Sequence, residues 1–90
     1  MKKQITVCFY FKGVGHSYIT IYTPDYPPYR QDIPGCHTFY LAPDTYILRA
    51  EGNVEIAGAS IEVKDETGNQ LLLMPLGTGY FSNADSFTVA

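Results

Sequence analysis

The sequence predicts an all-β fold, a single small two-sheet β-sandwich of seven to nine short antiparallel strands over residues 1–90. Apolar and β-branched residues alternate with polar ones in short runs, and none of these runs keeps the period of a helix. Most of the 8 glycines and 6 prolines fall between the runs, where an all-β chain needs its turns. Ninety residues leave room for one domain, and an apolar content of 46% suffices for a packed core.

The clearest element lies between residues 58 and 68. Ala59, Ile61 and Val63 alternate with polar residues, which is the period of a half-buried strand. Asp65 can start a turn by accepting from a downstream amide, and Gly68 can take a positive φ, so that the chain reverses. A β-hairpin with a second strand at residues 70–74 is expected.

The N-terminal part predicts a first hairpin. Residues 5–12 alternate with Ile5 and Val7 on the inward side, and residues 13–15 form a glycine-rich turn. In residues 16–23, isoleucines at 19 and 21 are expected to face inward, and tyrosines at 18 and 22 outward.

The segment Pro24–Gly35 is expected to be irregular. Its prolines remove amide donors and force the preceding residues into extended conformations. Because long loops in compact domains are often functional, this segment is the first place to look for a binding surface.

The remaining chain predicts further short strands, joined by turns at Gly52-Asn53 and by a loop at residues 83–86. The inward phase slips by one residue between Ile56 and Ala59, which indicates either a β-bulge or two separate strands. The expected strands cover residues 36–41, 45–51, 71–74, 80–82 and 87–89.

Three pieces of the chain carry a resemblance. Gly58–Asp65 with Gly68 is similar to the pattern "G-A-x-V-x-V-x-D…G", Gly79–Phe81 to "G-x-F", and Leu41–Leu48 to "L-x-P-G-x-Y-x-L", with Asp44 where glycine is usual. They resemble prealbumin-like sandwiches, which include carboxypeptidase regulatory-like domains and collagen-adhesin B-type repeats. The third piece follows the other two in that group, so the order here is permuted. The resemblance implies an immunoglobulin-like or prealbumin-like sandwich that acts as a non-catalytic accessory or adhesion-type module.

Charge and hydropathy narrow the partners. The formal net charge is -3 and the six basic residues are scattered, so nucleic acid is not expected as a partner. No apolar run is long enough for a membrane-spanning helix. The N-terminal residues read as a strand rather than a signal peptide, because the apolar run is short and no small-residue cleavage site follows. We therefore expect a cytoplasmic protein, with non-classical export left open.

Cysteine and histidine usage predicts neither a disulfide nor a metal site. Cys8 and Cys36 are expected to be two part-buried thiols, as in a reducing compartment. Together with His16 and His37 they lack the spacing of a metal site. No cofactor is expected, because residues 13–18 lack the third glycine of a dinucleotide loop and no helix follows.

The same reading argues against catalysis. Ser17 and His16 are neighbours on a strand and therefore face apart, and no carboxylates are paired in a recognisable catalytic context. A small enzyme is kept only as a remote alternative.

The candidate binding residues lie in or beside the proline-rich segment and are the aromatic Tyr22, Tyr26 and Tyr29 with the nearby Asp25 and Arg30. Tyrosine offers a large amphipathic contact area at low entropic cost, although these rings could instead cap the open end of the sandwich. The predicted function is a non-catalytic binding or assembly module that makes protein–protein contacts, including self-association, through a sheet edge or the Pro24–Gly35 loop. A carbohydrate-binding module that uses the loop tyrosines is the alternative.

Overall fold

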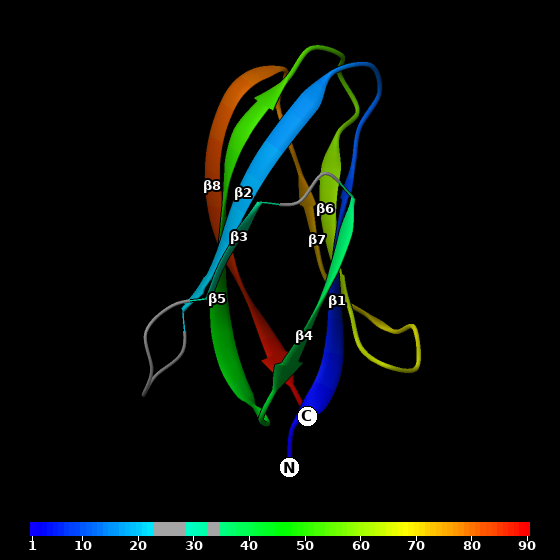
Figure 1. Ribbon diagram of the computed structural model, residues 1–90, viewed down its shortest axis with the longest axis vertical. Helices are drawn as coiled ribbons and strands as arrows, with labels where there is room; N and C mark the ends of the chain where they lie inside the picture. Colours follow the sequence, from blue (N-terminus) through cyan, green and yellow to red (C-terminus); the bar gives the residue numbers. More distant parts are fainter. Residues whose placement is uncertain (23–28, 33–34) are drawn as a thin grey trace.

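The computed structural model describes residues 1–22, 29–32 and 35–90, with residues 29–31 described by their backbone alone. Within these residues the chain forms eight strands and no helix (Figure 1), so no helix there is long and apolar enough to cross a membrane. The strands are β1 (Lys3–Tyr10), β2 (Gly15–Tyr22), β3 (Tyr29–Asp32), β4 (Cys36–Leu41), β5 (Asp44–Val54), β6 (Ser60–Lys64), β7 (Gln70–Pro75) and β8 (Gly79–Val89). The predicted all-β fold is confirmed.

The strands form two antiparallel sheets that face each other as the layers of a sandwich (Figure 1). One sheet has the order β4-β1-β6-β7 and is called the β1 sheet below. The other has the order β3-β2-β5-β8 and is called the β5 sheet. The predicted two-sheet sandwich is therefore confirmed.

A single hydrophobic core lies between the two layers. It is built from the alternate residues that the sequence predicts to face inward, and full burial of each such side chain contributes roughly 1.5–3 kcal/mol. The side chains with no exposed surface at all include Ile5, Val7, Ile19, Ile21, Leu48, Ile61 and Val63. Since each strand uses one face for the core, its other face is left to solvent.

The first predicted hairpin is wrong. β1 belongs to the β1 sheet and β2 to the β5 sheet, so residues 11–14 cross from one layer to the other. Phe11 stays partly buried at this crossing, where its ring stacks on Phe9 with centroids 4.6 Å apart. The alternation of a strand is the same whether its sequence neighbour lies beside it or in the opposite layer, which is why the pattern did not distinguish the two arrangements.

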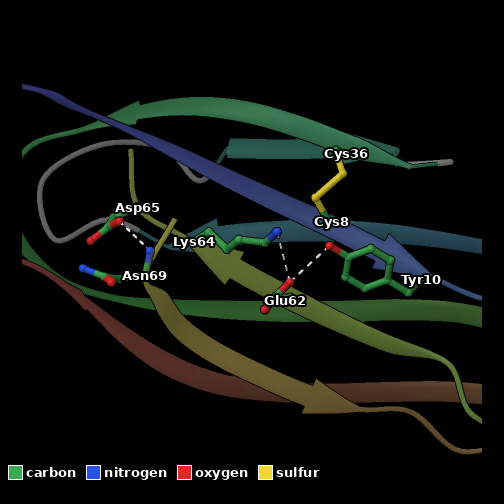
Figure 2. Close-up of polar contacts among 7 residues, drawn as sticks. All are labelled: Cys8, Tyr10, Cys36, Glu62, Lys64, Asp65 and Asn69. Carbon is green, nitrogen blue, oxygen red and sulfur yellow. Dashed lines mark hydrogen bonds and ion pairs between the residues drawn. A yellow bond between two sulfur atoms is a disulfide. The ribbon is translucent and has the colours of Figure 1, made fainter. Parts of the chain in front are cut away.

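The predicted hairpin of β6 and β7 is confirmed. The amide of Gly68, whose φ is 88°, donates to the carbonyl of Asp65 at 3.1 Å. The Asp65 carboxylate accepts from the amides of Thr67 and Asn69, both at 2.9 Å, and Figure 2 shows the second of these bonds. The side chain that begins the turn thus also holds it closed.

β5 and β8 are longer than predicted. They pair along their whole lengths, from Asp44 opposite Val89 to Val54 opposite Gly79. The predicted turn at Gly52-Asn53 and the predicted loop at residues 83–86 are both wrong, because they lie inside these strands. Pairing along a long partner strand has overridden the local turn preference of Gly, Asn and Asp. The phase slip is explained by two separate strands, since β5 ends at residue 54 and β6 begins at residue 60.

The expectation of two free thiols is also wrong. Cys8 of β1 lies directly opposite Cys36 of β4, and the two form a disulfide with their Cα atoms 4.0 Å apart (Figure 2). Between them the chain leaves the β1 sheet, builds β2 and β3 in the other layer, and returns as β4. Two cysteines 28 positions apart give no sign in the sequence that they will become cross-strand neighbours.

Candidate binding surface

The outer face of the β5 sheet carries large apolar and aromatic side chains. The alternation that buries Ile19 and Ile21 turns Tyr18 and Tyr22 of β2 toward solvent. Tyr80 of β8 is 76% exposed and is among the most exposed large hydrophobic residues that the structure describes. This face is therefore not a purely polar, solvated surface.

Strand register brings two of these tyrosines around a polar centre. Asn53 of β5 lies between His16 of β2 and Tyr80 of β8, and Glu51 occupies the neighbouring row beside Tyr18. Adjacent strands are about 4.8 Å apart, so the positions on β2 and β8 are roughly 10 Å from each other. Tyr18 and Tyr80 thus stand on either side of an amide and a carboxylate.

A shallow, open depression of about 400 Å³ lies at this place. Its lining consists of His16, Tyr18, Glu51, Gly52, Asn53 and Tyr80. All six belong to β2, β5 or β8, so the depression is built on paired strands rather than on loops. Side chains held on strands keep a more fixed geometry than side chains on loops.

Two polar pairs border the depression. His16 Nδ1 lies 3.4 Å from Asp32 Oδ1, and its ring meets Tyr18 edge-on with centroids 4.7 Å apart. Arg49 Nε lies 3.3 Å from Glu51 Oε1, and its Nη2 donates to Ser82 Oγ at 3.1 Å. These contacts hold the side chains of His16 and Glu51 in place at the rim of the depression, while the ring of Tyr80 stays exposed to solvent.

The outer face of the β1 sheet also carries exposed large side chains, those of Tyr10, Tyr40 and Leu73, beside a charged pair (Figure 2). Tyr10 Oη donates to Glu62 Oε1 at 3.1 Å, and Lys64 Nζ lies 3.5 Å from the same oxygen. The Tyr10 hydroxyl and then Glu62 raise the pKa of the Lys64 ammonium above its ordinary value, because both favour its charged form. On this face the charged side chains of Glu62 and Lys64 thus pair with each other, beside the Cys8–Cys36 disulfide.

The structure describes three of the five predicted binding residues and places them on the neighbouring strands β2 and β3. Tyr22 lies on the outer face of β2 opposite Ile47, four positions along the strand from Tyr18 and outside the depression. Tyr29 and Arg30 belong to β3, where their backbones pair with residues 21 and 20 of β2. The expectation that Pro24–Gly35 is irregular is therefore wrong for residues 29–32, which contain no proline and pair as an edge strand. Asp25 and Tyr26 lie outside the described residues.

The residues of the depression were not predicted as a site. A partial signal is present, because His16 and Tyr18 alternate with core residues along one strand. Glu51, Asn53 and Tyr80 come from two other strands, and only the pairing of β2, β5 and β8 brings them together. Within the described ranges, no group of three or more His, Cys, Asp or Glu side chains could hold a metal ion.

Comparison of the chain with protein-family models, with curated proteins and with solved structures gave no match. The resemblance to prealbumin-like sandwiches therefore stays a prediction.

Proposed function

We propose that this protein is a non-catalytic binding module that recognises another protein through the outer face of the β5 sheet. The observation that carries the proposal is the exposure of Tyr18 and Tyr80 on either side of the depression. Tyrosine is enriched at the centres of protein interfaces, since its ring supplies apolar area and its hydroxyl a hydrogen bond. Exposed aromatic side chains grouped on one face are characteristic of interaction sites.

The shape of the depression supports binding rather than reaction chemistry. Catalytic groups usually work in concave sites that exclude water, whereas this depression is open and shallow. Its only histidine, His16, is half exposed and engaged with Asp32. The lack of catalytic activity is itself part of what we propose.

The outer face is favoured over the β8 edge as the binding surface. At the β8 edge, Asn83 and Asp85 stand in register with Ala50 and Leu48 of β5, which face the core. Asn83 and Asp85 are nevertheless exposed. Polar residues at inward positions of an edge strand discourage the addition of another strand. The other predicted surface, Pro24–Gly35, lies mostly outside the described residues.

The Cys8–Cys36 disulfide bears on the compartment. Disulfides persist in oxidising environments and are rare in the cytosol. The expected cytoplasmic location stays a prediction, and the disulfide favours an oxidising compartment instead. Alkylation of free thiols in the source cells before lysis, followed by mass spectrometry, shows whether Cys8 and Cys36 are thiols or a disulfide there, and so distinguishes the cytoplasm from an oxidising compartment.

The proposal is tested by affinity capture from the source cells with two matched double variants. Tyr18→Ala with Tyr80→Ala alters the proposed face, and Tyr40→Ala with Leu73→Ala removes comparable exposed apolar groups from the β1 sheet. We expect a defined set of proteins to be lost with the first variant and retained with the second. Equal retention by both variants, or loss with the second alone, contradicts the proposal.

Self-association and sugar binding are the competing outcomes. Sedimentation of the purified protein detects a dimer, and a dimer that Tyr80→Ala dissociates makes a second copy of this chain the partner. The carbohydrate alternative predicts glycan-array binding that Tyr26→Ala and Tyr29→Ala abolish. Such binding with no protein captured through the Tyr18 and Tyr80 face replaces the proposal.

A further inference from the structure

We propose that the depression on the β5 sheet receives a cationic side chain, arginine or lysine, of the protein partner. This proposal rests on the proposed function and names the chemistry that the surface recognises. It is argued from the aromatic rings that flank the depression, from the charge around it, and from the acceptors at its centre.

The rings of Tyr18 and Tyr80 suit a cationic ligand. Tyr18 is 40% exposed and Tyr80 is 76% exposed, so both present ring surface to a ligand. The faces of aromatic rings attract guanidinium and ammonium groups within about 6 Å of the ring centroid. Tyr18 and Tyr80 lie two strands apart in neighbouring rows of the sheet, so a group in the depression can approach either ring.

The charged side chains in and beside the depression also favour a cationic ligand. Glu51 lines the depression, Asp32 lies beside His16 at its rim, and Glu55 lines a hollow that shares His16 and Asn53 with it. Arg49, a described cation beside the depression, is held by Glu51. Among the side chains that the structure describes here, carboxylates outnumber cations even if His16 is protonated. The surface therefore complements a positive ligand, and the net charge of -3 acts in the same direction.

The residues at the centre of the depression offer hydrogen-bond acceptors to such a ligand. Glu51 and Asn53 both carry side-chain oxygens that accept hydrogen bonds from a cationic donor. A guanidinium, which has five N–H donors in one plane, can donate to these oxygens while its face lies against a ring. An acidic ligand would instead meet carboxylates, and an aliphatic ligand would leave the oxygens without donors.

The test uses a pair of synthetic peptides, acetyl-Gly-Ser-Arg-Ser-Gly-amide and the same peptide with citrulline in place of arginine. Citrulline keeps the shape of the side chain but removes its charge. Each peptide is titrated into the ¹⁵N-labelled, disulfide-bonded protein, and amide shifts are followed by NMR. We expect the arginine peptide to shift Tyr18, Glu51, Asn53 and Tyr80 and to bind at least about fivefold more tightly than the citrulline peptide.

Three variants locate the interaction. Tyr80→Ala should weaken binding of the arginine peptide about two- to fivefold, whereas Tyr80→Phe, which keeps the ring, should bind as the wild type does. Glu51→Gln should also weaken it, and the difference between Glu51→Gln and wild type should shrink as salt is raised. The spectra of all three variants are first compared with that of the wild type to check that the fold is intact.

Equal binding of the two peptides, arginine-dependent shifts confined to other residues, or no shifts with millimolar peptide overturns the cation proposal. So does a glucose oligosaccharide that shifts the same four amides when the arginine peptide does not. If the cation proposal fails while cell-derived proteins are still lost with the Tyr18→Ala and Tyr80→Ala variant, the proposed function stands. Failure of both experiments removes the surface as a binding site.

Discussion

Gly52 shows how one residue can fix both the packing of a sheet and the shape of a site. It lies in the interior of β5 opposite Ser17 of β2, and a Cβ at this position would overlap the carbonyl oxygen of His16. The close approach of the two backbones therefore requires glycine. The same residue lines the depression next to Glu51 and Asn53.

Gly52→Ala is expected to lower the free energy of unfolding by at least about 2 kcal/mol, because the neighbouring backbone must move to admit a methyl group. Gly77→Ala is the matched control, since a Cβ there meets nothing within 4 Å and no positive φ is involved. Its effect should stay within about 0.5 kcal/mol. Urea denaturation measures both, and equal effects would contradict the steric explanation.

Asp65 contributes a pH dependence at a single turn. Hydrogen bonds from the Thr67 hydroxyl, and then from the amides of Asn69 and Thr67, hold the pKa of its carboxyl below the ordinary value of 3.8. A group with a lowered pKa stabilises the fold above its unfolded pKa, and this contribution is lost as pH falls through the folded value.

Asp65→Ala is therefore expected to be less stable than the wild type near neutral pH, and the difference should shrink below about pH 4. Thermal unfolding at pH 6 and at pH 2.5 measures it. Glu66→Ala serves as the control, because Glu66 is an exposed carboxylate in the same turn. A difference between Asp65→Ala and wild type that grows with acidification would rule out this role for the carboxylate.

Among the elements, β4 depends most on a covalent link. It pairs with β1 alone, and Cys36 fastens it to Cys8 at the end of their register. The disulfide closes a loop that contains all of β2 and β3, and loop-closure entropy for this separation of 28 residues is worth about 3–4 kcal/mol.

The double variant Cys8→Ala with Cys36→Ala should accordingly lose about 3 kcal/mol of unfolding free energy. Adding a thiol reductant to the wild type should cause a similar loss and leave the double variant unchanged. Urea titrations with and without reductant check this. Stability that does not change in either case would mean that the disulfide constrains nothing that the strands do not already hold.

The β8 edge is expected to be protected by its polar inward positions. Asp85 lies opposite Leu48, a core residue of β5, but its own side chain is exposed at the edge of the sandwich. Asp85→Val should therefore promote association through this edge, since it removes the charge that opposes strand addition. Sedimentation velocity at increasing concentration measures the effect. Ser86→Val adds the same side chain on the outward side, and equal association by both variants would point to general hydrophobicity instead.

At the scale of the whole molecule, the layers could be predicted and their connections could not. Alternation at Ile19, Ile21, Ile61 and Val63 is sufficient to predict strands with one buried face, and Asp65 with Gly68 is sufficient for one hairpin. These signals are local.

The connections and the site depend on pairing between distant segments. Whether β2 lies beside β1 or opposite it, whether Cys8 meets Cys36, and whether Tyr80 reaches the neighbourhood of Tyr18 are all decided by strand order and register. A single strand carries no information about its partner, so the sequence predicted candidate residues in and beside the proline-rich segment and did not predict the residues of the depression.

The central claim is that the protein acts through the outer face of the β5 sheet. A photo-crosslinking amino acid placed singly at Tyr80, at Ile47 and at Leu73 in the source cells tests it most directly, because the first two positions lie on that face and the third is exposed on the opposite sheet. We predict that positions 80 and 47 crosslink to the same protein and that position 73 does not. Crosslinking from position 73 alone, or equally from all three positions, would contradict the claim.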